Sequence, residues 1–478
     1  MANQKEGFWS TPLTGSLVKS QDVKLPEMLF GYFIGPFGAL LSSGIFTSFL
    51  SVYFTDVLLL DTAFLTGLQL VSTIFIVAAN LIVGQLIERT HALAGKARPW
   101  VLLSALTLSV GSVLMFIVPF QNETAKMVWV AIAYNLYYSV AYPIYNTANS
   151  TLIPVSTRDS GKRGALASFT NIAGLGVMGV GSMVFPILVS NVMKKDQNMW
   201  FLVMLAVAIF SGLTIFLQYK FTRERVTEES MGQAGSSVQP KTASMGEQLK
   251  AVTGEKWWWL VILFYLGFQW SGAMKNGSMA YFCQWVLDSS LVGGDYGVAQ
   301  TILAVLGAIP MAVASVVVVP LANKLSKRLL CMIGMVLGAV GGVIAGLFPT
   351  NLVLVAVGVA IKCLGSAPAC YLILAMLADV IDHIEFKTGI RTDGLTMSIY
   401  SSLMVAATPI MNAVFMGMLG SGYNPALSQQ ASGTVGIITV GYIWVETIAY
   451  VVCAALILLW TVEKNLPEEQ KAIAARKK

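Results

Sequence analysis

Three charged side chains lie inside stretches of sequence that are too apolar for a soluble protein. They are Lys275, Lys362 and Glu446. In hydrocarbon such a charge costs about 2.5 kcal/mol or more, so it normally faces a bundle interior or a watery cavity and finds a partner. Three roles stay open: the lysines, with the neighbouring Asn276, bind an anionic solute; a lysine pairs with Glu446 as a structural or gating ion pair; or Glu446 titrates and carries a coupling proton.

A polar stripe runs along another apolar stretch, with its members three or four residues apart. The stripe consists of Asn135, Tyr138, Tyr142, Asn146 and Asn149. This spacing places them on one face of a helix, where amide and phenol groups can hydrogen-bond a polar solute. Hydrogen bonding between membrane helices is the alternative. We therefore treat the stripe as a candidate solute-binding face.

A third candidate face, with Gln69, Thr73 and Asn80, carries neutral polar groups only. Amides and hydroxyls can support sodium, whereas a strongly held cation needs carboxylates. Structural packing is the simpler interpretation, and we keep Asn80 as a candidate coupling residue.

The composition says what kind of protein positions these residues. The chain has 478 residues, of which 56% are hydrophobic and 11% charged, and its mean hydropathy is +0.71. A soluble chain carries about 25% charged residues, so the sequence predicts a polytopic membrane protein in contact with a lipid bilayer. The net charge of +6 gives no reason to expect a nucleic-acid partner, and the five cysteines show no metal or disulfide spacing.

Apolar runs long enough to span a bilayer, about 20 residues each, can be placed twelve times. The expected spans are 27–53, 63–87, 100–120, 127–153, 165–190, 199–220, 257–287, 297–320, 329–349, 351–378, 395–420 and 436–461. Their continuity favours helices over barrel strands, which would alternate over about ten residues. We predict an all-α polytopic fold.

The positions of Lys and Arg predict the orientation. Of the 30 such residues, two are the intramembrane lysines, and three (Lys126, Lys194 and Lys195) fall in alternate loops. The rest fall in the tails and the other loops, so the positive-inside rule places both termini in the cytoplasm.

The longest connection is polar and separates six spans from six. The predicted organisation is a cytoplasmic tail (1–26), a six-helix bundle (27–220), a cytoplasmic linker (221–256), a second six-helix bundle (257–461) and a cytoplasmic tail (462–478). Two six-helix halves are typical of repeat-built secondary transporters.

Several connecting segments resemble those of a known family. They are FTDV (Phe54–Val57), GKARPW (Gly95–Trp100), LIPVSTRDSGKR (Leu152–Arg163) and LADVIDHIEFKTGIRTDG (Leu377–Gly394). In their order and placement they resemble the glycoside-pentoside-hexuronide cation symporters, the melibiose-permease-like branch of the major facilitator superfamily. The resemblance covers about residues 25–460 and implies the major facilitator fold and alternating access.

The resemblance also shows where this chain departs from the family. The two cation-binding carboxylates of the second helix match Ile76 and Asn80, and the fourth-helix carboxylate matches Asn146. The family's remaining sugar-site and charged positions fall near Leu40, Ser150, Ala167 and Val405. The family implies gating ion pairs at cytoplasmic connectors, carried over to Arg158, Arg163, Asp379, Asp382, Glu385 and Arg391, although solvated loop charge is the alternative.

These observations predict a monomeric secondary transporter, and not an enzyme, in the bacterial inner membrane or an equivalent plasma membrane. We expect a glycoside-like or small organic solute, with an anion such as a hexuronide favoured by the buried lysines. No cofactor is expected, and proton coupling is favoured over sodium because the acidic pair is missing. A lipid or amphipath carrier and a neutral-sugar uniporter or exchanger are the alternatives.

Overall fold

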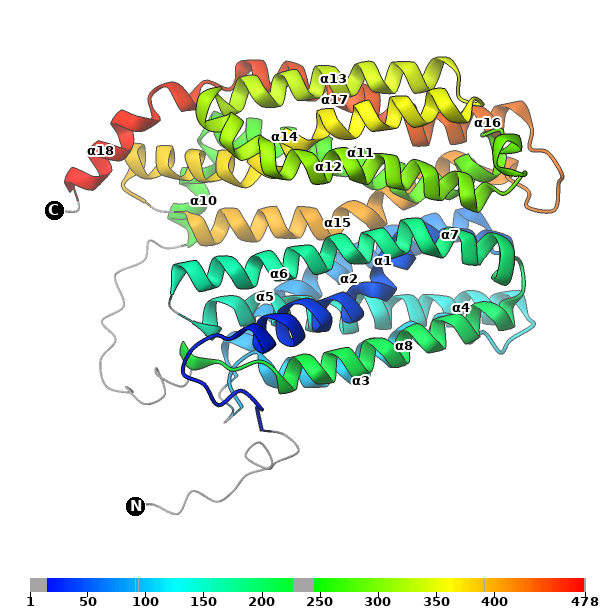
Figure 1. The fold of residues 1–478 in the computed structure, drawn as a ribbon, viewed down its shortest axis with the longest axis horizontal. Coiled ribbons are helices and arrows are strands. Elements are labelled where there is room, and N and C mark those ends of the chain that lie inside the picture. Colours follow the sequence, from blue (N-terminus) through cyan, green and yellow to red (C-terminus); the bar gives the residue numbers. More distant parts are fainter. Residues whose placement is uncertain are drawn as a thin grey trace. The chain divides into compact units, whose positions relative to one another are not determined.

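The computed structural model describes residues 15–90, 92, 94–157, 159–226, 245–390 and 392–476. The chain forms two compact units, Met1–Ser237 and Val238–Lys478. Each unit is a bundle of long helices that run alongside one another (Figure 1), and each is described by itself.

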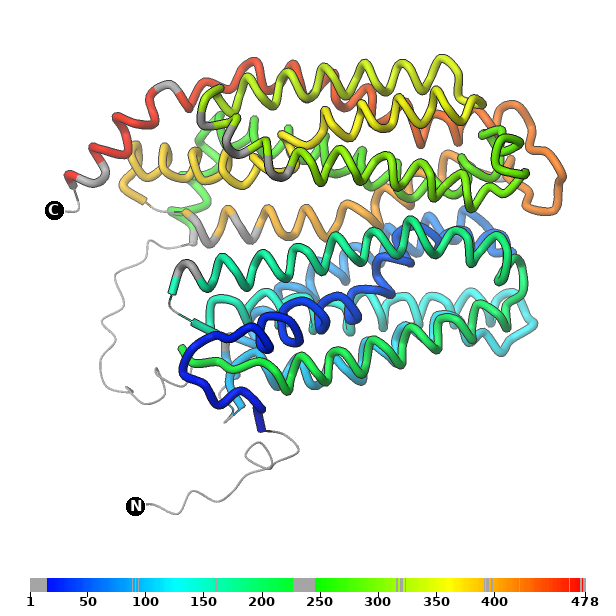
Figure 2. The backbone as a smooth tube through the Cα atoms, viewed as in Figure 1, coloured from blue at the N-terminus to red at the C-terminus, as the bar shows by residue number. Residues whose placement is uncertain are grey.

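The described part of the first unit contains six long helical segments, several of them interrupted by short π-helical turns (η). In chain order they are η2 (Glu27–Ile34), α1 (Gly35–Val52) and η3 (Tyr53–Val57); α2 (Thr62–Glu88); α3 (Arg98–Leu114); α4 (Glu123–Asn135), η4 (Leu136–Ala141) and α5 (Tyr142–Ser156); α6 (Ser160–Gly179), η5 (Val180–Val184), α7 (Phe185–Leu188) and η6 (Val189–Met193); and α8 (Gln197–Lys220). Figure 2 follows the backbone through them.

The second unit, over its described residues, also has six long segments, with short helices before and after them. They are α10 (Met245–Thr253), α11 (Lys256–Trp285), α12 (Tyr296–Lys324), α13 (Lys327–Leu347), α14 (Leu352–Thr388), α15 (Asp393–Leu419), then α16 (Ser432–Thr439), η9 (Val440–Trp444) and α17 (Val445–Leu459) in one run, and α18 (Leu466–Arg476). The 3-10 turns η7 (Ser290–Val292), η8 (Gly420–Gly422) and η10 (Val462–Lys464) lie between them.

All twelve predicted spans coincide with helical segments. Among the described residues, nine helices are long and apolar enough to cross a membrane, and Arg98–Leu114 is a shorter apolar helix. Side-chain caps begin several of them: Asp61, Asn122 and Asp196 each accept a bond from the backbone N–H two residues later, as N-cap residues do.

Two expectations about connectors were wrong. We placed Asp379, Asp382 and Glu385 in a loop after residue 378, but α14 continues to Thr388 and ends at Gly389, whose φ is +71°. A left-handed glycine is a common helix stop, and the stop lies ten residues later than hydropathy alone suggested. Similarly, α6 begins at Ser160, so Arg163 lies in its first turn.

Helices α13 and α14 pack alongside each other (Figure 1), and glycines bring their backbones into contact. A Cβ at Gly358 would lie 2.6 Å from the carbonyl oxygen of Gly341, and a Cβ at Gly341 would lie 2.7 Å from the backbone nitrogen of Lys362. Small residues allow such close approach between membrane helices. The backbone of Lys362 is therefore held directly against α13.

In both units a glutamate caps the start of another helix, and the short sequence that contains this glutamate is similar in the two units. The sixth helix of the first unit is followed by FTRER (Phe221–Arg225) and the last long helix of the second unit by WTVEK (Trp460–Lys464). Glu224 accepts the backbone N–H groups of Lys96, Ala97 and Arg98, each at 2.8 Å.

In the second unit, Glu463 accepts the backbone N–H groups of Lys327 at 2.9 Å and of Arg328 at 3.4 Å. These groups open α3 and α13, where the first N–H groups of a helix lack intrahelical partners. In each unit, an acid that follows the last long helix therefore caps the third long helix.

Candidate functional site

The three intramembrane charges meet in the second unit. The Nζ atom of Lys362 on α14 lies 2.7 Å from Oε2 of Glu446 on α17. The Nζ atom of Lys275 on α11 lies 3.3 Å from Oε1 of the same carboxylate. Two lysines from two helices therefore share one glutamate from a third, and we call Lys275, Lys362 and Glu446 the charge cluster.

Neutral groups complete the charge cluster. The Tyr450 hydroxyl, one turn after Glu446, donates to Oε1 at 2.9 Å. The Lys362 ammonium also donates to the carbonyl oxygen of Ile443 at 3.2 Å. Ile443 lies in η9, the π-helical turn directly before α17, and such turns often occur at functional sites.

The two lysines differ in their accessibility. The side chains of Lys362 and Glu446 are 4% and 2% exposed, whereas that of Lys275 is 21% exposed. Lys362 is therefore held by a buried ion pair with Glu446 and a hydrogen bond to Ile443, while Lys275 makes a longer contact with Glu446 and is partly exposed.

Glycines of α13 set the spacing of this site. A Cβ at Gly338 would lie 2.7 Å from the Tyr450 ring and 3.5 Å from the carbonyl oxygen of Lys362, and one at Gly342 would lie 2.9 Å from the Cβ of Thr447. Thr447 follows Glu446 directly, so α13 presses on both helices that carry the Lys362–Glu446 pair. Sequence reasoning missed this role of α13, which the run of glycines from Gly334 to Gly346 could have indicated.

The arrangement suits binding of an anion. Among the described residues, no group of three or more His, Cys, Asp or Glu side chains could hold a metal ion. The charge cluster has two cations and one anion, so it carries a net positive charge when all three are ionised. A buried net charge is costly unless it is paired, and an anionic group would complete the pairing.

The stripe of the first unit follows α4, η4 and α5. Tyr138 packs against Tyr134 and Tyr137, with ring centroids 4.6 and 5.0 Å apart. The Asn135 amide donates to the carbonyl oxygen of Ala131 at 3.0 Å on its own helix. Tyr142 lies 6.3 Å from Tyr137, ring to ring.

The two asparagines at the end of the stripe differ. The Gln218 amide of α8 donates to Oδ1 of Asn149 at 2.7 Å and its oxygen accepts from the Tyr145 hydroxyl at 2.9 Å. Asn149 is thus bonded to a neighbouring helix, as the packing alternative describes. Asn146 is partly exposed, and no hydrogen bond to its side chain is present in the part of the chain the structure describes.

The second-span candidates are bonded within α2. The Asn80 amide donates to the carbonyl oxygen of Ile76 at 2.8 Å, and the Thr73 hydroxyl to that of Gln69 at 2.8 Å. Asn80 and Ile76 occupy the positions at which the resemblance places the two cation-binding carboxylates. A short hydrogen bond within the helix therefore replaces that acidic pair here.

Three of the proposed gating residues, Asp379, Asp382 and Arg163, have a hydrogen-bond partner in their own unit. Asp379 accepts from the Lys327 ammonium at 2.6 Å, and Asp382 accepts from the Gln470 amide at 2.9 Å. Arg163 donates to the carbonyl oxygen of Thr157 at 2.7 Å, and Glu385 is buried. Arg158 and Arg391 lie outside the described residues.

A buried ion pair at the same end of the first unit was missed by sequence reasoning. Arg225 donates to both carboxylate oxygens of Glu27, at 3.0 and 2.7 Å, which joins the segment that follows α8 to the start of the first span. Beside it, the Lys162 ammonium bonds Asp22 and holds the pKa of that carboxyl below its usual value. Charges flanking the apolar spans were the only signal available for this pair.

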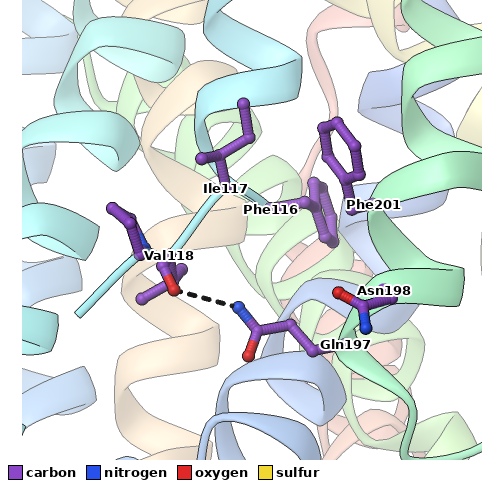
Figure 3. Close-up of a pocket in the computed structure, with 7 residues that line it drawn as sticks. Phe116, Ile117, Val118, Gln197, Asn198 and Phe201 are labelled. Carbon is purple, nitrogen blue, oxygen red and sulfur yellow. Dashed lines mark hydrogen bonds between the residues drawn. The ribbon is translucent and has the colours of Figure 1, made fainter. Parts of the chain in front are cut away.

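An open pocket lies between the segment after α3 and the start of α8. Figure 3 shows Phe116, Ile117 and Phe201 around it, and the Gln197 amide, which donates to the carbonyl oxygen of Val118 at 3.2 Å. None of its lining residues is charged. It therefore offers an acidic or basic solute no counter-charge.

Comparison with known proteins identifies the family. The family described as MFS/sugar transport protein matches residues 31–464. The chain belongs to this family. It is a membrane transporter of the major facilitator superfamily and not an enzyme.

Similar proteins agree with this assignment. The chain is 27% identical to an isoprimeverose transporter of Lactiplantibacillus pentosus, over 92% of this chain and 89% of that protein. It is 23% identical to a glucuronide carrier protein homolog of Escherichia coli (strain K12), over 91% of each. A solved bacterial homolog of the human lysosomal transporter Spinster superposes with a TM-score of 0.65 at 13% identity, covering 94% of this chain and 99% of that one, which shows the shared fold.

Proposed function

We propose that this protein is a secondary active transporter that carries an acidic, glycoside-like solute, such as a hexuronide, by alternating access. The observation that carries this proposal is the charge cluster: two lysines share one carboxylate among buried residues, at 2.7 and 3.3 Å. Buried ionisable groups in membrane helices commonly mark a substrate or ion pathway.

Membership of the family supports transport of a sugar-like solute, and one relative is described as a glucuronide carrier homolog. Within this proposal Lys275, Lys362 and Asn276 contact the acidic group. The stripe residues Asn135, Tyr138, Tyr142, Asn146 and Asn149 remain proposed solute-binding residues in the first unit.

The second helix supports coupling to a proton over coupling to sodium. Its two expected carboxylate positions hold Ile76 and Asn80, and the Asn80 amide is already bonded to its own helix. Accumulation driven by a sodium gradient alone would contradict this part of the proposal.

The proposed setting is the cell membrane, with the chain as a monomer and both termini in the cytoplasm. The positive-inside rule supports that orientation. Labelling of single cysteines introduced at Ser16 and Glu468 in intact cells and in inverted vesicles would test it, since both should react only in the inverted vesicles.

Uptake by proteoliposomes tests the function directly. Labelled glucuronate should enter faster than glucose, and Lys275→Ala should abolish the difference while the protein stays folded. Equal uptake of the two would favour the neutral-sugar alternative. Inhibition by lysolipids without inhibition by sugars would favour an amphipath carrier.

A further inference from the structure

We infer that Glu446 sets the charge of the transported solute. Its one negative charge lies between two lysines, so one further negative charge, supplied by the solute, would neutralise the charge cluster. The protein therefore selects monoanions over neutral solutes and over dianions. This inference rests on the proposed function, because it requires the charge cluster to be the acid-binding site.

The first step is that Glu446 is a fixed part of the site. Its side chain is 2% exposed, and both carboxylate oxygens have partners: Lys362 at Oε2, and Tyr450 and Lys275 at Oε1. Lys362 is fixed with it, since its ammonium also donates to the carbonyl oxygen of Ile443.

The second step is that the Lys275 ammonium can still donate a hydrogen bond to a second anionic group besides Glu446. Its 3.3 Å contact with Glu446 is longer than the roughly 2.7–2.9 Å of a charge-assisted hydrogen bond. An ammonium has three donors, and in the described part of the chain Glu446 is the one ion-pair partner of Lys275. With a fifth of its side chain exposed, Lys275 can turn a donor toward a solute.

The third step is a count of charges. Two cations and one anion leave one net positive charge in a site that is mostly buried. A monoanionic solute neutralises it, a neutral solute either leaves it uncompensated or requires a lysine to give up its proton, and a dianion reverses its sign. Because an unpaired charge away from water is costly, the complex with a monoanion is the most favourable of the three.

Substitutions that change this count should change the preferred solute. We would reconstitute wild type, Glu446→Gln and Lys275→Gln and measure uptake of labelled glucose, glucuronate and glucarate, which carry no, one and two negative charges. Wild type should prefer glucuronate. Glu446→Gln leaves two positive charges and should raise the glucarate-to-glucuronate ratio by about tenfold or more, the scale of a lost charged contact.

Lys275→Gln leaves no net charge and should lower the glucuronate-to-glucose ratio to a similar extent. This variant keeps the Lys362–Glu446 pair, so it tests the inference even if Glu446→Gln fails to fold. The matched control is Lys24→Gln, which removes one positive charge at an exposed position outside the charge cluster and should keep the wild-type order of solutes. Ratios between variants cancel differences in solute shape.

Two results would overturn the inference while leaving the proposed function standing. One is a wild-type protein that carries glucarate as well as glucuronate, and the other is a set of ratios that the charge-changing variants leave unaltered. Uptake of neither acid by wild type would instead overturn the proposed function, and the inference with it.

Discussion

Lys362 and Glu446, 2.7 Å apart on α14 and α17, form a buried ion pair whose two helices are both pressed against the glycines of α13. Taking two charges out of water is costly, and removing one partner leaves the other charge buried alone. A substitution that breaks the Lys362–Glu446 pair should therefore both destabilise this bundle and disturb the proposed binding site.

Lys362→Met should destabilise the protein by about 3–5 kcal/mol, the usual cost of breaking a buried pair. Adding Glu446→Gln should recover part of that loss, because the remaining Lys275 is partly exposed. Thermal unfolding in detergent, followed by intrinsic fluorescence, would measure both. A Lys362→Met protein as stable as wild type would show that the pair contributes nothing to folding.

The packing of α13 against α17 can be tested at one glycine. A Cβ at Gly342 would lie 2.9 Å from the Cβ of Thr447, closer than such atoms approach, so Gly342→Ala should move α17 and lower both the unfolding temperature and the uptake of glucuronate. Thr447→Gly in the same protein should restore much of both, since it removes the opposing atom. Gly436→Ala is the matched control: that glycine lies in α16 and nothing lies within 4 Å of its added Cβ, so no loss is expected.

The two capping glutamates, Glu224 and Glu463, should contribute differently to the stability of the protein. Glu224→Ala leaves three backbone N–H groups without their acceptor and Glu463→Ala leaves two, one of them bonded at 3.4 Å. Losing such partners costs about 1–3 kcal/mol, so the unfolding temperature should fall more for Glu224→Ala. The exposed Glu468, in the first turn of α18, provides the control, and Glu468→Ala should unfold like wild type.

Hydropathy predicted the twelve spans because each must cover the same thickness of hydrocarbon. A run of consecutive apolar residues meets that requirement, so it can be recognised from local sequence alone. The charge cluster was predicted only as a list of three residues and three alternatives. Which of them pair depends on how α11, α14 and α17 pack, and that packing is set by glycines of α13, a helix with no charge in its interior. Hydropathy also ended α14 too early, because its last three turns are charged and are stabilised by partners such as Lys327 and Gln470 from other helices.

Asn146 and Asn149 should respond differently to alanine. Asn149→Ala removes the partner of the buried Gln218 amide, so we expect a loss of stability of about 1–3 kcal/mol. Asn146→Ala removes no bond present in the described residues and should change solute uptake with an unaltered unfolding temperature. If Asn146→Ala destabilises the protein without affecting transport of any sugar or sugar acid, its proposed role in solute binding is wrong.

The net charge of the empty cluster leads to a last prediction, on the driving force. After releasing a monoanion the site keeps one positive charge, and closing around it without water would cost several kcal/mol. Loss of a proton from one lysine avoids that cost, so the monoanion and a proton should travel in the same direction and the cycle should be electroneutral. Glucuronate should therefore accumulate in proteoliposomes when the outside is acidic, even with the membrane potential held at zero by valinomycin and equal potassium. Nigericin, which collapses the pH gradient under these conditions, should abolish accumulation but leave exchange of internal for external glucuronate intact. Accumulation that follows the membrane potential and ignores the pH gradient would mean that the empty site returns with its charge, and would contradict proton coupling.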